Sequence, residues 1–385
     1  MKCSDIARRE FRRLATHPIY LFSMIGVPLF CAVFFLTMLN EGLPANLPIA
    51  LVDLDNSPVS RTLARQLDAF EKTQIVMQTA SFDEARLEMQ KKNIYGIYLI
   101  PRNFSVDASA GKQPVLSFYI NAAYLVPSAF LYQDMKMVSV LANVSTGLQR
   151  GAALGDTPEG TMAKLRPVEI DVHSLGNPWF NYSVYLCNTL LPGILQLMIF
   201  LITVYSIAME VKDGTARAWL RMGDDSLTKS LLGKLFPHTL IFTIVGFAYC
   251  ALMFGFNSFP LHSGWLPMLT AMFLLVIASQ AGGVFMMGLL PIPRLGLGIA
   301  ALFGVLSFSF AGLSFPVSNM HPSLQACSYL FPLRHYFLIS VDQALYGRDW
   351  FYSWPHYTAL LSFLALPLLI GKHLKKALLY FKYIP

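Results

Sequence analysis

The chain has 385 residues, of which 55% are hydrophobic and only 13% are charged, with a net charge of +7 and a mean hydropathy of +0.50. Ordinary globular domains carry about 25% charged residues, so this chain has too little polar surface to cover itself in water. The lipid bilayer is therefore the expected solvent, and the basic balance gives no reason to invoke nucleic acid as a partner.

Apolar residues concentrate in six windows, each of roughly 18 or more residues and long enough to cross the hydrocarbon core as a helix. The windows lie at 19–39, 182–208, 235–257, 266–290, 295–316 and 355–371. Residues 40–180 contain no such window and hold 26 of the 51 Asp, Glu, Lys and Arg residues. The pattern predicts a polytopic α-helical membrane protein with six transmembrane helices and a hydrophilic domain inserted between the first two.

Residues 1–18 precede the first window and are typical of a basic amphipathic helix on the membrane surface. The first window, 19–39, has the basic flank RREFRR, as a signal peptide would. No small-x-small cleavage site follows it, however. A retained signal-anchor helix explains the window better than a cleaved signal peptide does.

The insertion at 40–180 alternates strand-like and helical patterns. Strand-like runs occupy 47–55, 73–80, 95–101 and 113–121, and helical patterns occupy 58–70, 81–93 and 126–150. The order β-α-β-α-β-β predicts a small α/β domain, to which residues 165–175 could add a strand. Asp53 and Asp55 end the first strand, where a turn explains them better than a metal or catalytic site. His173 has no His or Cys nearby and is expected on the surface.

Residues 181–208 form the expected second transmembrane helix, and a charged segment at 209–234 separates it from the third. The stretch TARAWLRM within this segment contains helix-forming residues. Asp213, Gly214 and Thr215 supply a helix start, because Asp or Thr can cap free backbone N–H groups. A simple juxtamembrane loop with snorkelling basic side chains is the alternative.

Residues 235–316 hold the third to fifth transmembrane helices. Small residues in the pattern Gly296-x-x-x-Ala300-x-x-x-Gly304 mark a close helix approach, either within the bundle or across a dimer.

The stretch 317–352 follows the fifth window. It is rich in apolar residues but broken by prolines that include Pro322 and Pro332. A pair of re-entrant or interfacial helices fits this pattern. The sixth transmembrane helix is expected at 353–371, followed by a tail at 372–385.

The distribution of charge predicts the orientation in the membrane. With six spans, one side receives 15 basic and 6 acidic residues, and the other side, which includes 40–180, receives 14 basic and 16 acidic residues. Lys and Arg favour the cytoplasmic side. Both termini and the segment 209–234 are therefore expected in the cytoplasm, and residues 40–180 outside it.

The common nucleotide-binding, catalytic and metal-binding motifs are missing from this sequence. It contains no P-loop, HExxH or G-x-S-x-G pattern, and its five cysteines form no CxxC pair. We expect no catalytic residue, metal site or cofactor in this chain, and an intramembrane enzyme would lack a catalytic constellation. Energy for any active process would have to come from a partner or an ion gradient.

Uncharged polar residues stand out in the apolar windows, whose cores lack Asp, Glu, Lys and Arg. The candidates are Asn188, Gln196 and Gln280. In lipid such side chains usually form hydrogen bonds between helices, and lining a substrate path is the alternative.

The order EVKDGT, from Glu210 to Thr215, followed by AWLRM, resembles the first cytoplasmic loop of ABC-2 type export permeases. In that family an acidic residue and [D/E]-G-T precede a short coupling helix that contacts the ATPase. The family often has E-R-E-x-G-T, whereas Val211 and Lys212 stand between the acidic residues here, and the later proline of the family pattern is missing.

Other parts of the chain extend this resemblance. The N-terminal IARREFRRLATHP is similar to the interfacial connecting helix of the family, and IALVDLDNSPVSRTLARQL to the start of the extracytoplasmic domain in a subgroup with a large first loop. The segment with Pro322, Pro332 and Arg334 resembles the P-L-R-[HY] region before the last span in that subgroup.

The resemblance implies a permease subunit in the bacterial inner membrane. Its partners would be cytoplasmic ABC ATPase subunits, which bind ATP and Mg, a second permease that is a copy or a sister chain, and optionally a periplasmic adaptor and an outer-membrane channel. The implied ATPase-coupling residues are Glu210, Asp213, Gly214, Thr215 and Trp219. The cargo would be a hydrophobic or amphipathic drug, lipid or polymer. A membrane-anchored extracytoplasmic receptor or envelope docking protein, without transport activity, is the alternative function.

Overall fold

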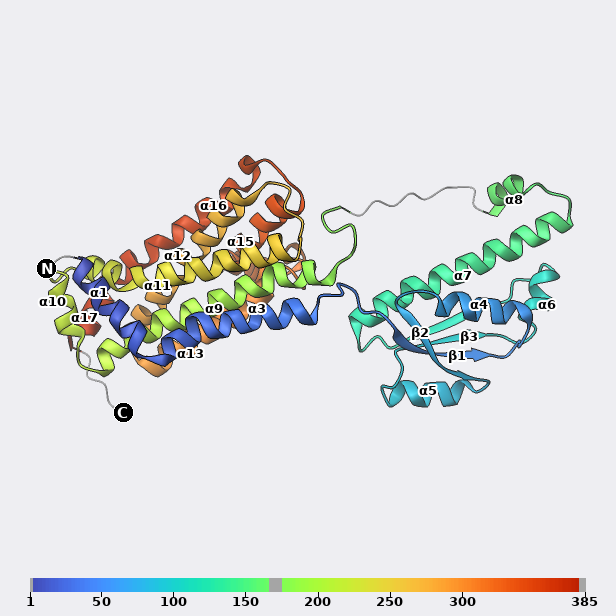
Figure 1. Ribbon diagram of the computed structural model, residues 1–385, viewed down its shortest axis with the longest axis horizontal. Helices are drawn as coiled ribbons and strands as arrows, with labels where there is room; N and C mark the ends of the chain where they lie inside the picture. Colours follow the sequence, from blue (N-terminus) through green and yellow to red (C-terminus); the bar gives the residue numbers. More distant parts are fainter. Residues whose placement is uncertain (1–2, 166–174, 381–385) are drawn as a thin grey trace. The chain divides into compact units, whose positions relative to one another are not determined.

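The computed structural model describes residues 3–165 and 175–380 (Figure 1). The chain divides into two compact units, one made of Met1–Gly42 with Ser174–Pro385 and the other of Leu43–His173. We call the first the helical unit and the second the α/β unit, and each is described by itself. Most of the strand expected near 165–175 lies outside the described residues. His173 also lies outside them.

Six helical segments of the helical unit are long and apolar enough to cross a membrane, so the chain is a polytopic helical membrane protein. They are Pro18–Met38, Tyr182–Lys212, Leu227–Phe256, Trp265–Leu289, Pro293–Ala311 and Trp350–Tyr380. The first consists of α2 (Pro18–Leu21), η1 (Phe22–Gly26) and α3 (Val27–Met38). The second is α9 (Tyr182–Lys212), and the third consists of α11 (Leu227–Cys250) and η2 (Ala251–Phe256). The fourth is α12 (Trp265–Leu289) and the fifth is α13 (Pro293–Ala311). The last consists of α16 (Trp350–Ser362), η5 (Phe363–Ala365) and α17 (Leu366–Tyr380).

Several of these helices run past the ends of their apolar windows, two of them furthest. The third span begins at Leu227 rather than at 235, and the last helix continues to Tyr380 rather than ending at 371. A hydropathy window stops where charged residues begin, but a helix keeps its own backbone hydrogen bonds satisfied and can continue into water. The charged segment is therefore mostly helical, with α10 (Ala216–Met222) between the ends of α9 and α11.

The core of the helical unit forms around α9 (Tyr182–Lys212), which packs against α3, α12 and α13. Fully buried side chains of α9 that include Leu191, Leu195 and Ile199 belong to the same apolar cluster as Met272 and Leu275 of α12 (Trp265–Leu289). A helix that is apolar on all sides can be buried in this way by its neighbours.

The small-residue pattern of α13 (Pro293–Ala311) faces α9 within the same chain. A Cβ atom added at Gly304 would collide with the Cδ1 atom of Leu197, and one added at Gly296 would lie 3.2 Å from a methyl carbon of Val204. Ala300, between them, is fully buried. Of the two roles that the pattern allowed, the structure shows packing within the bundle.

The Gly304→Val variant is therefore expected to destabilise the helical unit by about 1–3 kcal/mol, because the added atoms overpack the α9–α13 contact. The change is measured as a lower thermal unfolding midpoint of the protein in detergent. Gly298→Val is the matched control, because a Cβ at Gly298 of the same helix meets no atom within 4 Å. Equal midpoints for the two variants would contradict the packing role of Gly304.

The segment between α13 and α16 forms short helices. They are η3 (Val317–Asn319), α14 (Pro322–Ser328), α15 (Pro332–Ser340) and η4 (Val341–Leu345). Pro322 and Pro332 each occupy the first turn of a helix, where the missing N–H of proline leaves no hydrogen bond broken. α15 packs against α9, α12, α13 and α16.

The α/β unit contains a four-stranded sheet in the order β2-β1-β3-β4. β1 (Leu47–Asp53) is parallel to β2 (Thr73–Thr79) and β3 (Gly96–Ile100), and β4 (Ser117–Ile120) is antiparallel to β3. The helices are α4 (Pro58–Asp68), α5 (Phe82–Gln90), α6 (Phe104–Ser109), α7 (Leu125–Ala153) and α8 (Pro158–Leu165).

Helices cover both faces of this sheet (Figure 1). Ile49 and Leu51 of β1 pack with side chains of α4 and α7, whereas the alternate residues Ala50 and Val52 pack on the other face with α5. This alternation follows from the two-residue period of a strand. Asp53 accepts hydrogen bonds from the backbone N–H groups of Asp55 and Asn56, as the turn interpretation expects.

Candidate functional site

The turn at Asp213–Thr215 ends α9 and leads directly into α10, whose N-cap residue is Thr215. Gly214 has a φ of +68° and follows Asp213, the last residue with helical geometry. The N–H of Thr215 donates to the carbonyl of Glu210 at 3.0 Å, and that of Gly214 to the carbonyl of Val211 at 3.2 Å. These two bonds are the Schellman motif that closes a helix at a left-handed glycine.

The expected side-chain cap of α10 is therefore wrong. Thr215 is the residue before α10, but its side chain caps no N–H group there. Its hydroxyl instead donates to the carboxylate of Glu210. The glycine decides the geometry, because it makes the left-handed turn without a steric penalty.

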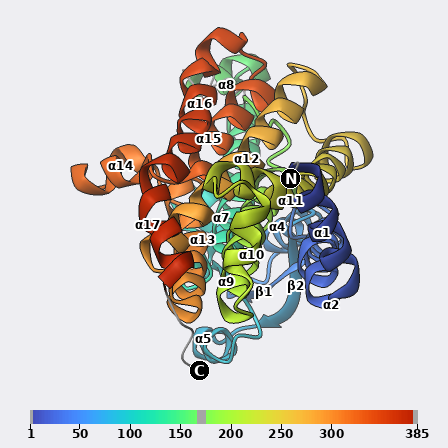
Figure 2. The same cartoon turned by 90° about the vertical axis from the view of Figure 1, so that its left-hand side faces the viewer.

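α10 lies at the same end of the helical unit as α1 (Cys3–Thr16), which Figure 2 shows facing the viewer. We call this the α10 end. Helix α10 has a buried face formed by Ala216, Trp219 and Leu220, which packs in a cluster with side chains of α1, α9, α11 and α17. The indole N–H of Trp219 donates to the backbone oxygen of Ser230 at 3.3 Å.

The opposite face of α10 is exposed. It consists of Arg217, Ala218 and Arg221. Arg217 donates to the backbone oxygen of Leu379 at 3.0 Å, which ties α10 to the end of α17. A partner can reach this face, whereas Trp219 is closed off from any partner by its own chain.

Charged side chains that lie far apart in the sequence meet behind α10. Lys234 of α11 places its Nζ atom 2.9 Å from Oε2 of Glu10 and 2.8 Å from Oε1 of Glu210. The side chains of Lys234 and Glu210 are 0% exposed and that of Glu10 is 2% exposed. The same ammonium lies 5.4 Å from the centre of the Trp219 ring, within the range of a cation–π contact.

Two arginines of α1 complete the surroundings of Glu210. Arg9 Nη2 lies 2.9 Å from Oε2 of Glu210, and Arg13 Nη1 lies 2.8 Å from Oε1. The second nitrogen of Arg13 lies 2.9 Å from the carboxylate of Asp213. Glu210 thus accepts from three cations and one hydroxyl, which satisfies a carboxylate that has lost its water.

Glu10 is held in a similar way on the other side of Lys234. It accepts a hydrogen bond from the hydroxyl of Ser206 at 3.1 Å, and Nε2 of His238 lies 3.2 Å from its Oε1. Burial by itself raises the pKa of Glu10, but the hydrogen bond with His238 and the charge of Lys234 lower it further than burial raises it, to about 2. Glu10 is therefore ionised at neutral pH.

We call these residues the charge cluster: Arg9, Glu10, Arg13, Glu210, Asp213, Lys234 and His238. Three carboxylates face three Lys and Arg cations, so these six charges balance. It joins α1, the end of α9, the turn into α10 and the start of α11. Because its members are mostly buried, these elements cannot separate without exposing charge that has lost its water.

Of the charge cluster, Glu210 and Asp213 were predicted from the sequence, and the other five residues were not. Ile6, Glu10 and Leu14 are all buried and recur every four residues, so Glu10 lies on the apolar face of an otherwise basic helix. An acidic residue on such a face is a signal that could have been found. Lys234 and His238 are likewise four residues apart on α11 and share one face.

The three uncharged polar residues of the apolar windows each form a hydrogen bond to another helix. Asn188 donates to Ser340 at 3.3 Å, Gln196 donates to Ser307 at 2.7 Å, and Gln280 accepts from Thr239 at 2.7 Å. These contacts match the expected hydrogen bonds between helices rather than the alternative of a substrate path. Only Gln280 also lines a large groove.

Arg334 of α15 lies in the segment expected to be re-entrant. Its Nη1 is 3.4 Å from the backbone oxygen of Ala311, at the end of α13, and its guanidinium carbon is 5.7 Å from the centre of the Tyr329 ring. Arg334 therefore holds α15 to the end of α13 and lies apart from the charge cluster in the sequence and in its contacts.

Comparison with known proteins identifies the family. A family described as "ABC-2 family transporter protein" matches residues 18–371, which is most of the chain. No curated protein matches the sequence.

Proposed function

The chain belongs to the ABC-2 family of transporter proteins, and from this premise we propose that it is the permease subunit of an ABC exporter. A separate ATPase subunit supplies the energy. The proposed cargo is a hydrophobic or amphipathic molecule, such as a drug, lipid or polymer, that leaves the cytoplasm or the inner membrane.

The charge cluster is the observation that carries the proposed mechanism. The exposed face of α10, with Ala218 and Arg221, is the surface on which the ATPase would act. The buried face of α10, through Trp219, touches the cluster at Lys234. Movement of α10 would therefore pull on α1, α9 and α11 together, because Glu210 and Lys234 tie these helices to one another.

This proposal gives the five coupling residues different roles. Asp213 and Gly214 are exposed and can contact the ATPase. Glu210 and Trp219 are fully buried and act as positioning residues that transmit movement. Thr215 holds Glu210 through its hydroxyl.

The remaining parts of the proposal follow from the distribution of charge and from the family. The α10 end would lie in the cytoplasm of a bacterial cell, and the α/β unit outside it, where it would receive cargo or dock a periplasmic adaptor and an outer-membrane channel. A second permease, either a copy or a sister chain, would complete the transmembrane path. ATP and Mg would bind to the ATPase partner.

We expect Ala218→Glu and Arg221→Glu to weaken binding of the ATPase by about tenfold or more, because each places a carboxylate without a partner in the proposed contact, and a cost of about 1.4 kcal/mol is tenfold in affinity. Both side chains are exposed, so folding should be unchanged. The measurement is the amount of ATPase that copurifies with the chain, together with the stimulation of ATP hydrolysis.

Arg294→Glu is the matched control. Arg294 is exposed near the start of α13, on the side of the membrane assigned to the cytoplasm, but outside α10. The control should bind the ATPase normally. If all three variants bind it equally well, the exposed face of α10 is not the contact. If the unmodified chain binds no ATPase, the receptor alternative is favoured.

A further inference from the structure

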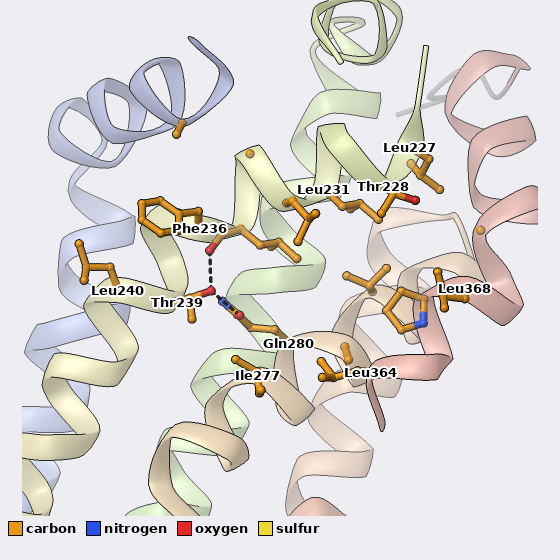
Figure 3. Close-up of a pocket in the computed structure, with 18 of the residues that line it drawn as sticks. Leu227, Thr228, Leu231, Phe236, Thr239, Leu240, Ile277, Gln280, Leu364 and Leu368 are labelled. Carbon is orange, nitrogen blue, oxygen red and sulfur yellow. Dashed lines mark hydrogen bonds between the residues drawn. The ribbon is translucent and has the colours of Figure 1, made fainter. Parts of the chain in front are cut away.

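A groove of about 1220 Å³ opens on the side of the helical unit, between α1, α11, α12 and α17 (Figure 3). It exceeds the upper end of the usual range for small-molecule pockets, about 1000 Å³. We call it the α11–α17 groove. It contains none of the charge-cluster residues, although Arg8 on its rim is the neighbour of Arg9.

Most of the groove is apolar and open. Phe236 and Leu240 of α11, Ile277 of α12 and Leu368 of α17 line it (Figure 3). Phe236 is 59% exposed and Leu368 is 70% exposed. Because these helices are long enough to span a membrane, the open side faces lipid, and hydrocarbon chains are the molecules available to fill it.

Positive charge gathers at one end of the groove. Arg8 of α1 and Lys372 and Lys375 of α17 line it there, and none of the described lining residues is Asp or Glu. Lys375 donates to the backbone oxygen of Asp225 at 2.6 Å, which is a neutral acceptor, so this contact leaves its charge uncompensated within residues 3–165 and 175–380. An anionic group is therefore the complementary occupant of this end.

The groove also contains an unsatisfied polar side chain. Gln280 is 4% exposed, and Thr239 contacts its amide oxygen at 2.7 Å, as Figure 3 shows. Among the described residues, the amide nitrogen of Gln280 has no hydrogen-bond partner, and neither does the hydroxyl of Thr243. Both side chains line the groove, so a ligand that carries acceptor oxygens beside its apolar part would satisfy them.

We propose that the α11–α17 groove binds one anionic phospholipid of the surrounding membrane. The phosphate lies against Arg8, Lys372 and Lys375, and the acyl chains lie along the apolar wall. The ester oxygens, which join headgroup to chains, are acceptors for the Gln280 amide. The proposal requires only that the helical unit lies in a bilayer and does not depend on binding of an ATPase.

The test is native mass spectrometry of the full chain in detergent, titrated with dioleoyl phosphatidylglycerol or dioleoyl phosphatidylcholine. The two lipids have the same chains, so a difference in affinity reports the headgroup. We expect phosphatidylglycerol to bind at least about tenfold more tightly, because each basic residue near an anionic headgroup contributes about 1 kcal/mol, or about a fivefold change. Equal affinities would overturn the proposal.

The Arg8→Gln/Lys372→Gln variant is expected to bind phosphatidylglycerol about 25-fold more weakly, with little change for phosphatidylcholine. Arg12→Gln/Lys376→Gln is the matched control, because it removes the same charges from exposed positions of the same two helices outside the groove. The control should change the affinity less than twofold. An equal loss in both variants would indicate general surface charge and overturn the assignment to the groove.

A second pair of variants tests the apolar wall. Ile277→Trp should fill the groove and weaken binding of both lipids about tenfold, whereas Leu266→Trp, at an exposed position of α12 outside the groove, should not. Unchanged binding to folded Ile277→Trp would place the lipid elsewhere. The thermal unfolding midpoint shows that each variant is folded.

Discussion

The Glu210→Gln variant is expected to lose about 3–5 kcal/mol of stability and most of its ATP-driven transport. Glutamine has the shape of glutamate but no charge, so Arg9, Arg13 and Lys234 would keep their positions around a neutral amide. Removing one partner of a buried ion pair carries a penalty of this size, because the opposite charge remains buried without compensation. The measurements are the unfolding midpoint in detergent and the ATP hydrolysis stimulated by cargo.

Asp213→Asn is the control for Glu210→Gln. It makes the same chemical change one turn away on the same helix, but the Asp213 side chain is 41% exposed and pairs only with Arg13 among the described residues. An exposed pair of this kind contributes about 0–1 kcal/mol. If the two variants prove equally stable, the buried position of Glu210 has no special role in stability.

The Lys234→Met variant is expected to destabilise the helical unit by a similar amount, about 3–5 kcal/mol at neutral pH. Methionine fills much of the space of lysine but leaves Glu10 and Glu210 facing each other without the ammonium that lies 2.9 Å and 2.8 Å from them. Two buried carboxylates then repel, and the cation–π contact with Trp219 is lost as well.

This loss should shrink as the pH falls. The pKa of Glu10 is about 2 in the intact protein, partly because of Lys234, and removing Lys234 raises it. In the intact protein the lowered pKa of Glu10 contributes stability that is lost as the pH falls below the normal value for Glu. In the variant the pKa of Glu10 is lowered less, so less of this stability is present at neutral pH and less of it is lost at low pH. The difference between the two proteins should therefore be smaller at low pH.

Lys229→Met provides the comparison, because Lys229 lies on the same helix with a 60% exposed side chain and an ion pair to the exposed Asp224 at 3.2 Å. Its effect should stay below about 1 kcal/mol. A double-mutant cycle of Glu210→Gln and Lys234→Met should give a combined loss smaller than the sum of the two, because each removes the same contact. Additive losses would show that the two side chains do not act on each other.

Much of the architecture could be predicted because it depends on local patterns. The six apolar windows correspond to six helices of spanning length, since about 20 apolar residues are sufficient for a membrane helix wherever they occur. In the α/β unit, the strand-like run at 47–55 corresponds to β1 (Leu47–Asp53), since a short apolar run that ends in turn residues is a local signal of a buried strand.

The turn at Gly214 shows where local patterns fail. Asp213-Gly214-Thr215 is compatible both with the end of one helix and with the start of the next. The structure uses the turn for both: the N–H groups of Gly214 and Thr215 reach carbonyl groups of the preceding helix, and the carbonyl of Thr215 accepts the first hydrogen bond of α10 from Trp219. Only the side-chain cap that the pattern suggested is missing. The boundary at Leu227 was displaced for a related reason, because Lys229 and Lys234 lower the hydropathy of a helix without interrupting it.

The sequence alone therefore determined the six spans, the excess of positive charge on one side of the six-span arrangement, and the resemblance to ABC-2 permeases. Each of these is a sum over neighbouring residues or an order of short motifs. Only the tertiary structure brought together the charge cluster and the α11–α17 groove. Arg9 and Glu210 are 201 positions apart, and whether such charges neutralise one another depends on distances of about 3 Å, which are set by how the helices pack.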